Sequence, residues 1–112
     1  MKAAERILRN DIVQKMKTIK LPTCNNARIN SPEVFSAVPE PELGTLSFIG
    51  SDIEVKVYVR QCTIEYVGLK GNEEPEVILR HNVHNNVEAN IECINSSLRT
   101  IIKVLRESNL LD

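Results

Sequence analysis

The sequence predicts an α+β fold, a two-layer sandwich in which an antiparallel sheet of three or four strands packs against helices. Three observations lead to this expectation. In the last third of the chain, apolar residues recur at alternating steps of four and three, the spacing of an amphipathic helix. The middle of the chain alternates apolar and polar residues, as in a strand with one buried face. Residues 1–20 carry a second, less regular helical pattern.

The expected C-terminal helix has the clearest pattern. Its apolar stripe holds Val87, Ile91, Ile94, Leu98, Ile101 and Leu105, and Ile102 widens it. Asn85 is the expected N-cap, and Glu88, three residues later, would complete a capping box. We expect this helix to lie with its stripe on the sheet.

The expected N-terminal amphipathic helix, residues 1–20, is less regular. Its apolar face holds Ala4, Leu8, Ile12, Met16 and Ile19. Ile7 and Val13 lie off this face, so either the helix contacts a second surface or these two are scattered exposed residues.

Charge is unevenly distributed along the chain, although the formal net charge is only −1. Residues 1–20 carry six basic and two acidic side chains, whereas residues 31–76 carry nine acidic and three basic ones. Either these charges compensate each other inside the molecule, or the basic helix is presented to an acidic partner.

Residues 21–43 are expected to form a long Pro-rich loop. Ser31 and Pro32 suit the N-cap and the first position of a short helix over residues 32–38. This helix would carry Val34, Phe35 and Val38. The three side chains either pack on the chain's own sheet or insert into a groove of a partner.

The expected sheet and C-terminal helix occupy residues 44–112. Strands are expected at Gly44–Ile49, at Ile53–Arg60, from Cys62 through Tyr66, and at Glu76–Val83. The apolar positions change from odd to even numbers near Arg60, which predicts a turn or a bulge there. Cys62 is expected to point into the core.

The order of helix, loop, strands and helix resembles that of RWD-type domains, small α+β modules that mostly mediate protein–protein contacts. The resemblance is one of topology. The tyrosine–proline turn typical of that family is absent from this sequence, so no residue is carried over.

No motif in the chain points to catalysis or to a cofactor. His81 and His84 with Cys62 and Cys93 are the only soft-ligand set, and their spacing does not match the close pairs that zinc prefers. The four glycines form no phosphate-binding loop. With four aromatic residues in all and acidic strands, nucleic-acid binding is not expected either.

We therefore expect a non-enzymatic protein–protein interaction module, a subunit or adaptor that works with protein partners as a homo- or hetero-oligomer. The candidate contact residues are Ile7, Val13, Val34, Phe35, Val38, Tyr58 and Arg60. The alternative is a small-ligand site between the sheet and the C-terminal helix. No apolar run approaches a membrane span, and three widely spaced cysteines indicate a reducing compartment, the cytoplasm or the nucleus.

Overall fold

The structure, a computed structural model, describes residues 3–16, 19, 27–30, 42–60 and 62–108. This part of the chain contains two helices, α1 (Ala3–Met16) and α2 (Val87–Glu107). It also contains five strands, β1 (Ala27–Asn30), β2 (Glu42–Phe48), β3 (Ile53–Arg60), β4 (Thr63–Lys70) and β5 (Glu76–Asn82). The predicted α+β class and the two terminal helices are confirmed.

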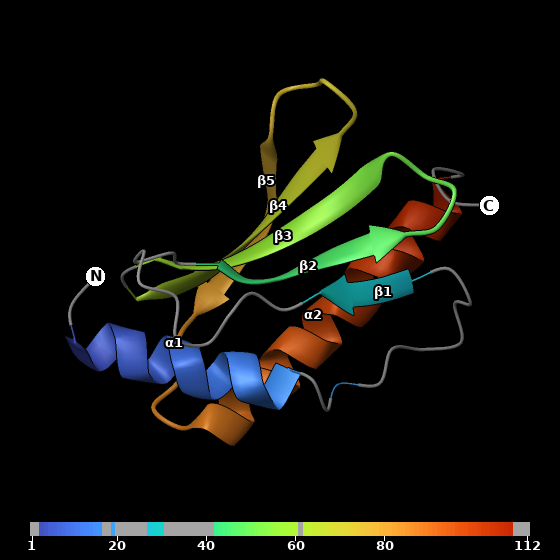
Figure 1. Ribbon diagram of the computed structural model, residues 1–112. Coiled ribbons are helices and arrows are strands. Elements are labelled where there is room, and N and C mark those ends of the chain that lie inside the picture. The colour runs from blue at the N-terminus through green and yellow to red at the C-terminus, as the bar shows by residue number, and fades with distance from the viewer. Residues whose placement is uncertain (1–2, 17–18, 20–26, 31–41, 61, 109–112) are drawn as a thin grey trace.

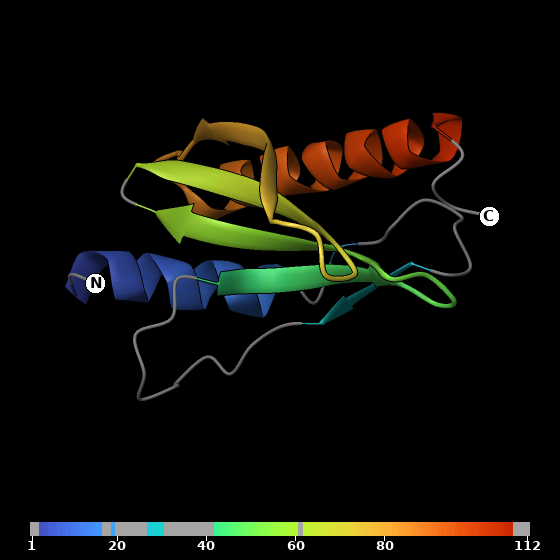
Figure 2. The ribbon, with the colours of Figure 1, turned by 90° about the horizontal axis from the view of Figure 1, so that it is seen from above.

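The strands form one antiparallel sheet in the order β1-β2-β3-β4-β5, so each strand pairs with the strand before it in the sequence. Both helices lie on the same side of this sheet (Figure 1). The view from above shows the strands in front of the helices (Figure 2). The sheet thus has a helix-covered face and a face that no described helix or strand covers.

The sheet has five strands in the described residues, not the three or four that the sequence predicts. The additional strand, β1, lies inside the stretch expected to be a loop, and it pairs Ala27 with Phe48 and Asn30 with Thr45. Four residues are too few for an alternating pattern to stand out. Residues 21–26 and 31–41, with the expected short helix 32–38, lie outside the described residues.

The predicted phase change after Arg60 is confirmed, because β3 ends there and β4 begins at Thr63. Val59 and Ile64 both point into the core from either side of this turn. The expectation for Cys62 is wrong: its side chain is exposed. Cys62 precedes the first residue of β4, and its carbonyl accepts a hydrogen bond from the backbone N–H of Val83 at 2.9 Å.

The core lies between the covered face of the sheet and the two helices. The predicted stripe of α2 is confirmed, since Ile94, Leu98, Ile101 and Ile102 are buried. From the sheet the core receives Leu43, Leu46, Phe48, Ile53, Val55, Val57, Val59, Ile64 and Tyr66. Alternation along β3 therefore places its even-numbered side chains on the open face.

Helix α1 contacts both α2 and β2, which explains its irregular apolar pattern. Val13 is fully buried with Ile12 and Met16, so it belongs to the core and is not a contact residue on the surface. Ile7 is 63% exposed. The guanidinium Nε of Arg9 donates to the carbonyl of Glu42 at 3.2 Å and so joins α1 to the start of β2.

The start of α2 differs by one residue from the expected position. The N-cap is Asn86, not Asn85, and its side chain accepts from the backbone N–H of Ala89 at 2.8 Å. One turn later, the fully buried Asn90 bonds to both backbone groups of His84. Near this end, Lys15 Nζ of α1 lies 3.9 Å from the Glu88 carboxylate, one compensation of basic by acidic charge within the molecule.

Candidate protein-binding surface

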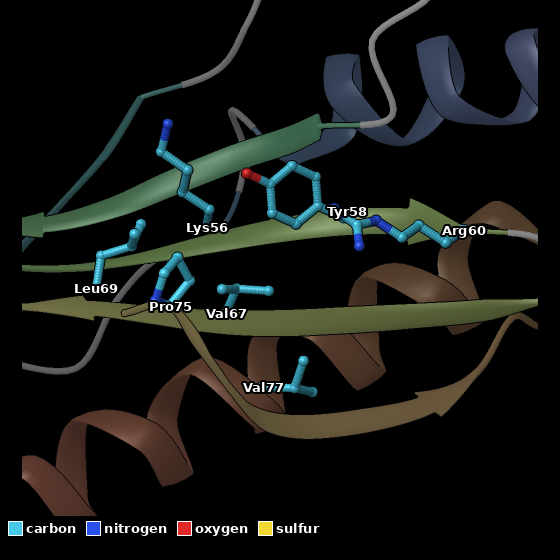
Figure 3. Close-up of a pocket in the computed structure, with 7 residues that line it drawn as sticks. All are labelled: Lys56, Tyr58, Arg60, Val67, Leu69, Pro75 and Val77. Carbon is cyan, nitrogen blue, oxygen red and sulfur yellow. The ribbon is translucent and has the colours of Figure 1, made fainter. Parts of the chain in front are cut away.

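The open face of the sheet carries a mixture of charged, aromatic and apolar side chains. The register pairs Tyr58 with Glu65 and Lys56 with Val67, so these four residues share one face of β3 and β4. Figure 3 shows the residues of this face that line a hollow, with both helices behind the sheet. These residues, together with Glu65 and Arg80, form what we call the open-face site: Lys56, Tyr58, Arg60, Glu65, Val67, Leu69, Pro75, Val77 and Arg80.

One half of the open-face site is a chain of charged contacts centred on Glu65. The Arg60 guanidinium lies over the Tyr58 ring, with its carbon 4.5 Å from the ring centroid. The Glu65 carboxylate forms ion pairs with two arginines: Oε1 lies 3.5 Å from a terminal guanidinium nitrogen of Arg60, and Oε2 lies 3.5 Å from Nε of Arg80 in β5. Its side chain is only 14% exposed, whereas those of the two arginines are more than half exposed. Glu65 therefore holds two arginines in place while their outer faces remain accessible to a partner.

The other half is apolar. Val67, Leu69, Pro75 and Val77 line a hollow of about 320 Å³ together with Lys56, Tyr58 and Arg60. Val67 is 8% exposed although no described helix lies over it, because Val77 of β5 and Lys56 of β3 flank it in the sheet. Val77 itself is 44% exposed. The hollow thus has an apolar floor that remains open to solvent.

The charged side chains that line this hollow are of one sign, and Glu65 lies beside them in contact with Arg60. The lining includes two cations, Lys56 and Arg60, and no carboxylate. Arginine and tyrosine are the residue types that most often dominate the binding energy of protein interfaces. The arrangement suits an acidic side chain or terminus next to an apolar one, since the cations would pair with the acid and the floor would bury the apolar group.

No protein-family model, curated protein or solved structure matches this chain. Within the described ranges, no three His, Cys, Asp or Glu side chains are grouped so that they could hold a metal ion. No helix in the same ranges is both long and apolar enough to cross a membrane.

Of the residues singled out from the sequence, the structure brings together Tyr58 and Arg60, which stack on the open face. Ile7 is exposed on α1, which packs against the helix-covered side of the sheet. Val13 is in the core. Val34, Phe35 and Val38 lie outside the described residues.

The sequence does not lead directly to Glu65, Val67, Leu69, Pro75 or Val77. Two of them, Val67 and Leu69, could have been found from the sequence of β4. The strand has apolar residues at even positions (Ile64, Tyr66) and also at odd positions (Val67, Leu69). Because even and odd positions point to opposite faces, such a strand is apolar on both faces. The pairing of Glu65 with Arg80 depends on the strand register, which the sequence alone does not supply.

A second hollow, of about 310 Å³, lies where the sheet meets the C-terminal half of α2. Its apolar lining includes Ile53, Val55, Ile78 and Leu105. Glu73, Glu74 and Glu76 stand at its rim with Lys70. This is the region in which the alternative small-ligand site is expected.

Among the described residues, the titratable group whose pKa is shifted most lies at the opposite end of the covered face. Tyr66 is fully buried, and its hydroxyl is 2.8 Å from Nε2 of His81 on the neighbouring strand. Burial raises the pKa of the Tyr66 phenol, and the nearby Cys93 raises it further, while a hydrogen bond with Ser97 acts in the opposite direction. Tyr66 therefore stays protonated at neutral pH and acts as a structural hydroxyl.

Proposed function

We propose that this protein is a protein–protein interaction module that binds an extended segment of a partner protein on the open face of its sheet. The observation that carries the proposal is the Tyr58–Arg60 stack beside a solvent-open apolar floor. A buried aromatic or arginine anchor next to apolar surface is the usual energetic centre of a protein interface.

The proposed partner segment carries acidic and apolar side chains alternately along one of its faces, so that an apolar residue stands two positions after each acidic one. An extended peptide places side chains on one face at every second residue, about 6.8 Å apart, and Lys56, Tyr58 and Arg60 repeat along β3 with the same period. An acidic residue opposite Lys56 or Arg60 would form an ion pair at the rim, and the next apolar side chain would cover Val67. Charge complementarity thus favours an acidic over a basic segment.

A small-ligand site between the sheet and α2 is supported less well. The second hollow is lined by apolar side chains with three carboxylates and a single lysine at its rim, and its lining includes no aromatic ring and no arginine. The open face offers an aromatic ring, two arginines and a lysine. The two readings predict binding at different side chains.

The test uses two fluorescent ten-residue peptides that share the same apolar residues at every fourth position, and two residues after each of these stands an aspartate in one peptide and a lysine in the other, so that both kinds of side chain lie on one face of the extended peptide. We expect the aspartate peptide to bind with a micromolar Kd, on the order of weak module–peptide contacts, and the lysine peptide to bind at least about tenfold more weakly. Methyl NMR signals of Val67, Leu69 and Val77 should shift on binding, and those of the core residue Leu98 should not.

Two variants and a matched control locate the contact. Arg60→Glu and Tyr58→Ser should each abolish binding of the aspartate peptide. Lys103→Glu reverses a charge on the exposed side of α2 and should leave binding unchanged. Equal binding of both peptides, or shifts confined to Ile78 and Leu105, would refute the open-face proposal; the second result would support the alternative hollow.

A further inference from the structure

At the junction of β5 and α2, a thiol and an imidazole lie in contact. Sγ of Cys93, in the second turn of α2, is 3.1 Å from Nε2 of His84, in the loop that precedes the helix. His84 is exposed and Cys93 is partly exposed, so a small reagent can reach the pair from solvent. The thiol can donate its hydrogen to Nε2 when that nitrogen carries none.

The contact is held by the fold, because Asn90 fixes the backbone that carries the imidazole. Its Oδ1 accepts from the backbone N–H of His84 at 2.7 Å, and its Nδ2 donates to the His84 carbonyl at 3.1 Å. Asn90 is fully buried and lies three residues before Cys93, on the same side of α2. The same helix therefore supplies the thiol and the clamp that positions its base.

Cys62 and His81 serve as internal controls for Cys93 and His84, respectively. Cys62 is exposed in the turn between β3 and β4, and no imidazole in the described part of the chain contacts its thiol. His81 lies near the end of β5, close to His84 in the sequence, but its ring is hydrogen-bonded to the hydroxyl of Tyr66. Only the Cys93–His84 pair combines accessibility with a base at hydrogen-bond distance among these residues.

We propose that Cys93, with His84 as its base, is a modification site that undergoes thiol–disulfide exchange with low-mass disulfides of the glutathione type. Nε2 of His84 accepts the thiol proton, and the Cys93 thiolate attacks one sulfur of the disulfide. The new bond joins Sγ of Cys93 to that sulfur, and the disulfide bond of the reagent breaks. The departing thiolate takes the proton from the imidazolium and leaves as a thiol, so the protein sulfur is oxidised and one half of the reagent is reduced.

The experiment measures the modification of Cys93 and Cys62 in the same molecule by peptide mass spectrometry, with glutathione disulfide as the probe. The full chain carries Cys24→Ser so that two thiols remain. We expect Cys93 to react about tenfold or more faster than Cys62, although Cys62 is the more exposed, because only Cys93 has a base in contact.

Two histidine variants distinguish the action of His84 as a base from the general effect of removing an imidazole near Cys93. His84→Gln should lower the Cys93 rate about tenfold and leave the Cys62 rate unchanged. His81→Gln removes an imidazole from the same end of the sheet without touching the pair, and should leave both rates within about twofold. The proposal is overturned if Cys93 reacts no faster than Cys62, or if His84→Gln and His81→Gln change the Cys93 rate equally.

Discussion

The side chain of Asn90 forms two hydrogen bonds with the backbone of His84, six residues earlier in the chain, and is itself fully buried. One amide group thus satisfies the backbone donor and the backbone acceptor of a single loop residue. The geometry ties the loop after β5 to the first turn of α2, just beyond the last residue of the strand.

We expect Asn90→Ala to lower the free energy of unfolding by about 1–3 kcal/mol, because it removes two hydrogen bonds made by a fully buried side chain, each worth about 0.5–1.5 kcal/mol. Urea unfolding followed by circular dichroism measures the change. Asn72→Ala, in the exposed turn between β4 and β5, is the matched control and should stay within about 0.5 kcal/mol of the parent. Equal stability of the two variants would mean that the clamp contributes nothing.

Leu98→Ala should destabilise the protein by about 2–5 kcal/mol, since Leu98 is fully buried at the centre of the α2 stripe and its truncation leaves a cavity. Val104→Ala removes a side chain that is 53% exposed on the same helix, and should change stability by less than about 0.5 kcal/mol. Thermal or urea denaturation distinguishes the two. A melting temperature unchanged by Leu98→Ala would contradict the packing of α2 on the sheet.

The two off-stripe residues of α1 should behave differently from each other. Val13→Ala should cost about 2 kcal/mol of stability, because it removes buried methyl groups from the contact of α1 with α2 and β2. Ile7→Ser should leave stability within about 0.5 kcal/mol. If α1 also contacts a partner, Ile7→Ser weakens that association at constant stability, which light scattering of the purified chain would detect.

Alkaline pH should destabilise the protein partly through Tyr66. Below pH 10.0, the ordinary pKa of tyrosine, the phenol is neutral in both the folded and the unfolded chain, so its contribution is fully present. Because burial raises the pKa of Tyr66 in the folded state, only the unfolded chain releases the proton just above that pH. Stability should then fall by about 1.4 kcal/mol per pH unit on account of this group.

Tyr66→Phe provides the comparison, because it removes the titrating hydroxyl and keeps the ring. The difference in unfolding free energy between the parent and Tyr66→Phe should be constant below pH 10.0 and shrink above it. A difference that is independent of pH up to the unfolding transition would show that Tyr66 ionises equally in both states.

The two helices and the alternation of β3 could be predicted from the sequence because their patterns are long enough to be distinctive. The seven positions of the α2 stripe specify one face of one helix. By contrast, β1 has only Ala27 and Ile29 as apolar residues, which is too short a pattern to predict a strand. Only its pairing with β2 in the structure identifies it as one. The prediction that Val13 is a contact residue is wrong for a different reason. A helix that packs against two elements has two apolar faces, and a pattern with a single stripe describes only one of them.

The candidate site was predictable only in part. Tyr58 and Arg60 could be placed on the solvent face of β3 by alternation alone. The contacts of Glu65 with Arg60 and Arg80 join three strands, so they depend on two registers and a bulge between Tyr66 and Val67. The Cys93–His84 pair depends on the path of the loop after β5, which Asn90 fixes through bonds that no sequence pattern indicates.

The strand order has a consequence for how this chain reaches its fold. Every strand after β1 pairs with the one synthesised just before it, and the β2–β3, β3–β4 and β4–β5 pairings close short loops that lose little chain entropy. Such local pairings correspond to low contact order, and we expect the sheet to form within milliseconds. Helices α1 and α2 meet each other under the sheet, and among the contacts between the described elements this one joins the segments that lie farthest apart in the sequence. Docking of α1 is therefore expected to be the last step of folding, and the basic helix would remain accessible to other molecules until then.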